Sequence, residues 1–127
     1  MEFIGRDAQK AGKMSYQDKL DAAMKLLEDM TIISAKAFEP SKTVLIIFKM
    51  DSNELWLAEQ NMKAIVAAVQ GLMPIGYRLR MAAKMENGLT GLTITLAEQA
   101  TKDLDAGAEV IDWASIAEEY NVATGLK

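Results

Sequence analysis

Five side chains that could bind an anion share one face of a predicted β-hairpin. Arg78, Arg80 and Lys84 alternate with other residues along one strand, and Thr93 and Thr95 lie on the next. Arginine can donate two parallel hydrogen bonds to a phosphate or carboxylate, and threonine adds a hydroxyl group. The patch therefore predicts a site for a phosphate, a nucleotide or an acidic partner. The alternative is a solvated sheet face, or a face that pairs with an acidic part of the same chain.

Histidine and cysteine are both absent from the 127 residues. Their absence removes the usual general base, the usual zinc ligands and every thiol nucleophile. The acidic residues between positions 103 and 109 do not follow the spacing of a calcium-binding loop. We therefore expect no enzyme activity, no metal site and no cofactor.

The hairpin that carries the five residues is predicted over 77–86 and 89–96, where apolar residues recur at every second position. Asn87-Gly88 between the strands is the preferred pair for a type I′ turn, in which both residues have positive φ. The two-residue loop predicts the opposed pairs Ala83 and Leu92, Met81 and Ile94, Leu79 and Leu96, Arg80 and Thr95, and Ala82 and Thr93. We expect all the large apolar members to be buried. Arg78, Arg80 and Thr93 should be exposed.

A strand and a helix are predicted just before the hairpin. Every residue from Val44 to Phe48 is apolar, which is typical of a strand, here about 43–50, that is buried on both faces. The sequence 51–54 then offers an N-cap with a glutamate three positions later. It predicts a helix over about 53–72, whose apolar residues recur at spacings of three and four.

The N-terminal part of the chain begins with an arm, residues 1–14, that is polar except at a few positions. Phe3 and Ile4 are its candidate anchors, on a neighbouring subunit or on the protein's own surface. Ser15 is a predicted N-cap for a helix over about 15–38. A break near Met30 followed by a strand is the alternative, because β-branched residues cluster there.

Residues 97–127 form an acidic C-terminal segment with seven acidic and two basic side chains. Within it, Asp112 could cap a short helix over about 112–120. The central helix also has a second side, which would contact another subunit or the first helix; its members are Trp56, Leu57, Ala64 and Ala68.

These elements predict an α+β single domain over 1–127, with helices packed on a small mixed or antiparallel sheet. We expect a non-enzymatic assembly or protein-interaction module that forms a homo-oligomer or binds another protein. A small anionic ligand held by the basic sheet face is the alternative. The net charge of −4 argues against a protein whose whole surface coats nucleic acid. No uninterrupted apolar run is long enough to predict a membrane-spanning segment. We expect a soluble intracellular protein, in the cytoplasm or in a virus particle.

Overall fold

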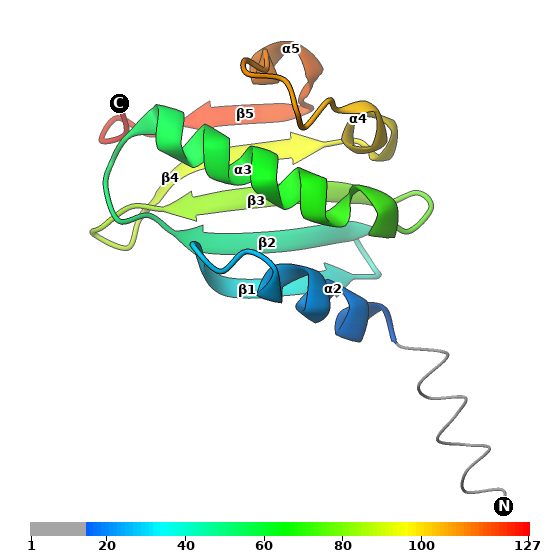
Figure 1. The fold of residues 1–127 in the computed structure, drawn as a ribbon. Helices are drawn as coiled ribbons and strands as arrows, with labels where there is room; N and C mark the ends of the chain where they lie inside the picture. Colours follow the sequence, from blue (N-terminus) through cyan, green and yellow to red (C-terminus); the bar gives the residue numbers. More distant parts are fainter. Residues whose placement is uncertain (1–14) are drawn as a thin grey trace, which may run out of the picture.

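The computed structural model describes residues 15–127, which form an open five-stranded sheet packed with four helices (Figure 1). The strands are β1 (Thr31–Phe38), β2 (Thr43–Lys49), β3 (Arg78–Lys84), β4 (Thr90–Leu96) and β5 (Glu119–Val122). The helices are α2 (Tyr16–Lys25), α3 (Leu55–Val69), α4 (Glu98–Asp103) and α5 (Trp113–Ile116), with a 3-10 turn η1 (Gln70–Leu72). The predicted single-domain α+β fold with a mixed sheet is confirmed.

The order of the strands in the sheet is the order of the strands in the chain, from β1 to β5. Strands β2 and β3 are parallel, and every other neighbouring pair is antiparallel. The parallel pair requires a crossover, which α3 supplies by running across the sheet (Figure 1). The crossover and the mixed sheet agree with the sequence analysis.

The register of the β3–β4 hairpin is as predicted, with Met81 opposite Ile94 and Arg80 opposite Thr95. The predicted type I′ turn is wrong, because Gly88 has a positive φ of 86° and Asn87 does not. The Met85 N–H donates to the Leu89 carbonyl at 2.8 Å, so the loop holds three residues rather than two. A register shift follows, since Lys84 lies opposite Thr90 whereas Ala83 lies opposite Leu92. That bulge restores the predicted pairs.

The burial of the hairpin is predicted correctly with one exception. Five large apolar residues are fully buried, namely Leu79, Met81, Leu92, Ile94 and Leu96, and Arg78 and Arg80 are exposed. Thr93, expected to be exposed, keeps only 8% of its surface. It lies in an interior strand, between Ala82 of β3 and Asn121 of β5, and its short side chain sits low among its neighbours. A position on the outward face of an interior strand is therefore not enough to expose a threonine.

The predicted helix over 15–38 is wrong, and the alternative with a break near Met30 is confirmed. The Ser15 hydroxyl caps α2 by accepting a hydrogen bond from the Asp18 N–H at 3.1 Å, but α2 ends at Lys25. Residues 31–38 form β1 instead, paired with β2 along its whole length. Their β-branched side chains suit a strand, and pairing with β2 satisfies backbone groups that a helix would satisfy locally.

The predicted helix over 112–120 is also wrong beyond its first turn. Helix α5 ends at Ile116, and β5 begins three residues later. The helical spacing of Trp113, Ile116 and Tyr120 misled the interpretation, because Tyr120 instead lies opposite Ile94 in the sheet. Backbone pairing with the free edge of β4 therefore outweighs the local helical spacing.

Helix α3 begins at Leu55 without the predicted side-chain cap. The Leu55 N–H donates instead to the backbone carbonyl of Lys127 at 2.6 Å, and the Lys127 N–H donates to the Asn53 carbonyl at 3.2 Å. The Asn53 side-chain oxygen, a candidate cap, accepts from the Glu86 N–H at 3.2 Å. A residue distant in the sequence thus satisfies the first N–H of the helix.

Helices α2 and α3 lie on the same face of the sheet, and the core lies between them and the strands (Figure 1). The core-facing residues of β2 are Val44, Ile46 and Phe48, all fully buried. Leu45 and Ile47 alternate with them and are only half-buried. The expectation that β2 is buried on both faces is therefore wrong for one face. No helix within 15–127 is long and apolar enough to span a membrane.

Candidate interaction surface

The face of the sheet that points away from α2 and α3 brings the five predicted ligand-binding residues together. We call it the open face. Its residues stand in rows across the strands, because paired residues point to the same side. One row contains Lys36, Leu45, Arg80, Thr95 and Glu119, and the next contains Ser34, Ile47, Ala82, Thr93 and Asn121. Arg78 and Lys84 lie at the two ends of β3 on the same face.

Both arginines of the open face are paired with glutamates. Arg78 Nε lies 2.9 Å from Glu118 Oε1, and Arg80 Nη1 lies 2.9 Å from Glu119 Oε1. The Thr95 hydroxyl, only 4% exposed, donates to the same Glu119 oxygen at 2.9 Å. The two glutamates belong to the acidic C-terminal segment, so the structure contains the self-pairing that the sequence analysis weighed as its alternative.

Three lysines complete the positive charge of the open face. Lys49 lies beside Lys84 in the parallel register of β2 and β3, and Lys84 Nζ donates to the Thr90 hydroxyl at 3.0 Å. Lys36 lies on β1 beside Leu45. Within residues 15–127, no carboxylate lies within 4.0 Å of these three ammonium groups. The open face therefore carries five basic side chains against Glu118 and Glu119, on a chain with a net charge of −4.

An apolar strip runs along the open face between these charges. Leu45 and Ile47 of β2 are half-buried, Phe38 of β1 is 43% exposed, and Ala82 lies beside Ile47. The sequence analysis did not identify Leu45 and Ile47 as surface residues, because a continuous apolar run does not tell which of its faces is covered. The sequence predicts too few helices to cover both faces of the sheet, and this was the only sign that one face of β2 is uncovered.

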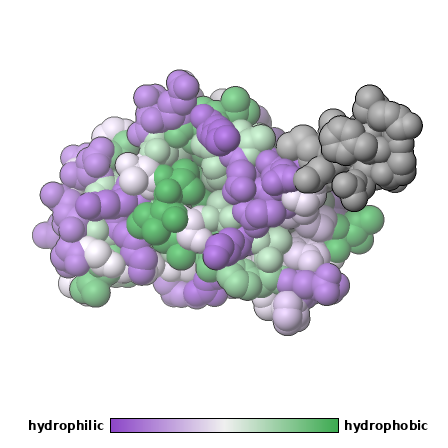
Figure 2. All heavy atoms as spheres, turned by 90° about the horizontal axis from the view of Figure 1, so that it is seen from below, coloured by the Kyte–Doolittle hydropathy of each residue, from purple (hydrophilic) through white to green (hydrophobic). Residues whose placement is uncertain are grey.

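The outer edge of the sheet at β1 is protected against pairing with another strand. Gln17 of α2 donates a hydrogen bond of 2.7 Å to the Ala35 carbonyl of β1, and an irregularity at Ile33 interrupts the ladder. Such features reduce edge-to-edge association. Figure 2, which views the molecule from this side, shows hydrophobic groups interspersed with hydrophilic ones and no continuous apolar surface. The edge is therefore a weaker candidate for binding than the open face.

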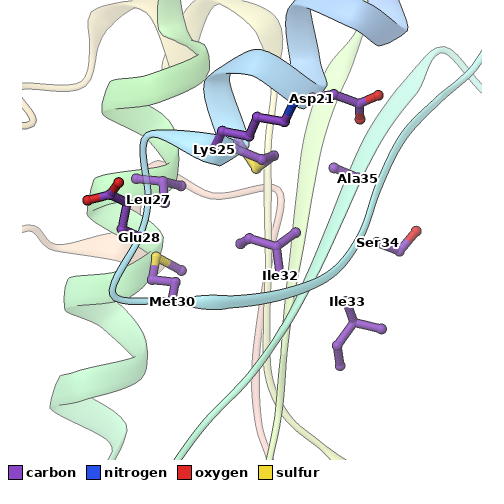
Figure 3. Close-up of a pocket in the computed structure, with 10 residues that line it drawn as sticks. Asp21, Lys25, Leu27, Glu28, Met30, Ile32, Ile33, Ser34 and Ala35 are labelled. Atoms are coloured by element: carbon purple, nitrogen blue, oxygen red, sulfur yellow. The ribbon is translucent and has the colours of Figure 1, made fainter.

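A shallow hollow of about 460 Å³ lies between the end of α2 and β1. Leu27, Met30 and Ile32 face this space, whereas Ile33 lies farther out along β1 (Figure 3). The polar residues that line it are Asp21, Lys25, Glu28 and Ser34, and the side chains of Glu28 and Ser34 point away in opposite directions (Figure 3). The hollow therefore offers no convergent set of polar groups of the kind that orients a small ligand.

A second hollow, of about 380 Å³, lies between α4 and α5. We call it the acidic hollow. Its walls are mostly apolar and its acidic side chains belong to the C-terminal segment; the lining residues are Ala100, Asp103, Leu104, Asp105, Ala108, Val110, Ile111 and Ile116. Val110 is 86% exposed, which is unusual for a large apolar side chain. The sequence analysis identified the acidity of this segment but not its apolar surface.

The four residues of the predicted contact side of α3 differ in their exposure to solvent. Trp56 is 61% exposed, whereas Leu57 and Ala68 are half-buried and pack against the core. Ala64 is half-buried as well. The two other candidate contacts, Phe3 and Ile4, lie outside the described residues. Whether this side of α3 contacts a partner stays a prediction.

One strongly perturbed titrating group lies at the junction of β5 and α3. Burial, followed by the hydrogen bond to Glu59 and the negative charge of that residue, raises the pKa of Tyr120 to about 12.

No group of three or more acidic residues within 15–127 is arranged to hold a metal ion. Comparison of the chain with protein-family models, with curated proteins and with solved structures finds no match.

Proposed function

We propose that the protein is a non-enzymatic assembly module that forms a homo-oligomer, or binds another protein, through the open face of its sheet. The observation that carries the proposal is the position of Leu45 and Ile47. These residues belong to a strand whose sequence suits burial on both faces, but the described chain covers only one face. A partner on the open face would complete their burial.

The size of the open face supports this proposal. Strands about 4.8 Å apart, with about 3.3 Å per residue, give a five-stranded face of roughly 500 Å². Contact with an equal area on a partner would bury about 1,000 Å² in total, near the lower limit for a specific interface. The apolar strip along β2 and the charged side chains around it resemble the core and rim of such an interface.

The alternative, a small anionic ligand held by Arg78 and Arg80, has less support from the geometry. Each arginine already has a glutamate within 2.9 Å, so an anion would have to displace both carboxylates. Lys49 and Lys84 remain without a carboxylate among the described residues, but an exposed and a half-buried lysine on a sheet face offer no enclosed cavity.

The proposal is tested by measuring the mass of the protein in solution over a wide range of concentrations. We expect an oligomer, and we expect Ile47→Glu to shift it to the monomer because a buried, unpaired carboxylate is costly in an interface. Ile75→Glu is the matched control, since Ile75 is 88% exposed in the loop before β3, away from the open face. It should leave the oligomer intact.

A second variant guards against loss of folding. Leu45→Thr introduces a β-branched residue, which suits a strand, and removes apolar surface from the open face. It should weaken association while circular dichroism and the melting temperature show a folded protein. A wild-type protein that is monomeric at every concentration would contradict homo-oligomer formation. An oligomer unaffected by Ile47→Glu and Leu45→Thr would place the interface elsewhere.

A further inference from the structure

The chain carries two surfaces that are complementary in charge and alike in layout. On the open face, the apolar strip with Leu45 and Ile47 lies between Lys36, Lys49 and Lys84. In the acidic hollow, apolar walls lie beside Asp103 and Asp105. We infer that copies of the protein associate head to tail, the open face of one against the acidic hollow of the next. This inference rests on the proposed function, because it names the partner of the open face.

Charge excludes the simpler arrangement in which two open faces meet. In the part of the chain that the structure describes, each face carries five basic side chains and two carboxylates, both already paired with arginines. Bringing two such faces together would place like charges against one another in an interface from which water is removed. The partner surface must therefore be acidic, and the C-terminal segment of the same chain supplies one.

The acidic hollow also provides apolar side chains that require cover. Val110 is 86% exposed and Ile116 is 37% exposed, and both line the hollow with the half-buried Leu104. In a head-to-tail contact these side chains would pack against Leu45 and Ile47. Asp103 and Asp105 would lie near the lysines that have no carboxylate partner among residues 15–127. The contact would thus bury apolar surface and pair charges at the same time.

The two surfaces use different residues, so one copy can offer both at once. An interface of this heterologous kind closes into a ring or continues into a filament, and does not stop at a symmetric dimer. The mean mass should therefore rise beyond that of a dimer with concentration. Added salt should lower it, because the exposed charges at the rim are screened.

The test uses two variants of the full chain, each with one damaged surface. Lys49→Glu/Lys84→Glu reverses the charge of the open face, and Asp103→Lys/Val110→Lys does so in the acidic hollow. Each variant alone should be monomeric, because one of the two required surfaces is missing. An equimolar mixture should associate again, since one variant retains the hollow and the other retains the open face, and the two altered surfaces are also opposite in charge. Sedimentation velocity or mass photometry would measure these species.

The control is Leu26→Lys/Glu28→Lys, which changes the net charge by the same amount as Asp103→Lys/Val110→Lys, at exposed positions near the end of α2. It should assemble like the wild type. If Asp103→Lys/Val110→Lys assembles normally while Ile47→Glu does not, the head-to-tail contact is wrong and the proposed function stands. A mixture that remains monomeric also overturns the head-to-tail contact. A monomeric wild type overturns both the contact and homo-oligomer formation.

Discussion

The hydroxyl of Tyr120 donates a hydrogen bond of 2.6 Å to Glu59 Oε2, and so joins β5 to α3. Strand β5 has only four residues and lies at the edge of the sheet. It nevertheless supplies Glu119, which holds both Arg80 and Thr95 on the opposite side of the strand. The Tyr120–Glu59 hydrogen bond, on the core side of the sheet, therefore helps to hold β5 in the position in which Glu119 contacts Arg80 on the open face.

We expect Tyr120→Phe to lower the free energy of unfolding at neutral pH by about 1 kcal/mol, because Glu59 loses its donor in a partly buried place. Tyr16→Phe is the matched control. The Tyr16 hydroxyl is buried and has no hydrogen-bond partner among residues 15–127, so its removal should cost nothing. Urea unfolding of the two variants would measure the difference. Equal losses for the two would contradict a stabilising role for the Tyr120–Glu59 bond.

Tyr120 should also make stability depend on pH in the alkaline range. Its pKa rises from 10.0 to about 12 on folding, so the folded state holds this proton more tightly than the unfolded state. The resulting stability is complete below pH 10 and is lost as the pH rises towards 12. Tyr120→Phe should flatten this decline, measured as melting temperature against pH. Tyr16, whose pKa is raised first by burial and then by the charge of Tyr77, contributes a decline that remains.

Gly91→Ala should destabilise the β3–β4 hairpin by about 1–3 kcal/mol. A Cβ atom at this position would lie 2.6 Å from Met85 Cγ, so the methionine would have to move within the core. In a Met85→Ala background the clash disappears, and the same glycine change should become neutral or slightly stabilising. A double-mutant cycle in urea would measure the coupling, and independent effects of the two changes would rule out the clash as the cause.

Ile94→Ala should cost about 2–5 kcal/mol, because Ile94 is fully buried between the sheet and the helices. Thr93→Ala should cost less than about 1 kcal/mol, although Thr93 is also buried, since its side chain lies on the open face and not in the core. Denaturant unfolding of both variants would decide it. A cost for Thr93→Ala as large as for Ile94→Ala would mean that the open face is covered within the chain.

Phosphate should stabilise the variant Glu118→Ala/Glu119→Ala more than the wild type, because both arginines of β3 lose their carboxylates. The gain in melting temperature should fall with added sodium chloride. Adding Arg78→Ala/Arg80→Ala to the variant is the control and should abolish the gain. A wild type stabilised by phosphate as strongly as the variant would restore the anion-binding alternative.

The hairpin could be predicted from the sequence because alternation constrains the pairing strongly. The turn type was wrong, yet the pairs around Met81 and Ile94 were right, since only one register buries the apolar set. The three-residue loop and the shift near Gly91 compensate for each other. Neither could be predicted, because the close approach of Met85 to Gly91 is a tertiary contact.

Residues 31–38 and 119–122 show where sequence patterns are insufficient. Both segments fit a helical spacing and both are strands, because each lies against a strand that has free backbone groups. The same difficulty affected the candidate site. Its five residues do share one face, but the partners of Arg78 and Arg80 are Glu118, just before β5, and Glu119, in β5, and both positions were predicted as helix. Leu45 and Ile47 were assigned to the core for want of a way to distinguish the two faces of β2.

The strand order has a consequence for the rate and route of folding. Every neighbouring pair in the sheet is also consecutive in the chain, so β1–β2 and β3–β4 can form as local hairpins with small loop-closure entropy. Closure is longer for the pairing of β4 with β5, across the residues of α4 and α5, and longest for the parallel pairing of β2 with β3, across the residues of α3. Contacts between α3 and these two strands should therefore dominate the folding transition state, with high φ-values at Ile65 and Ile46 and low values in β5.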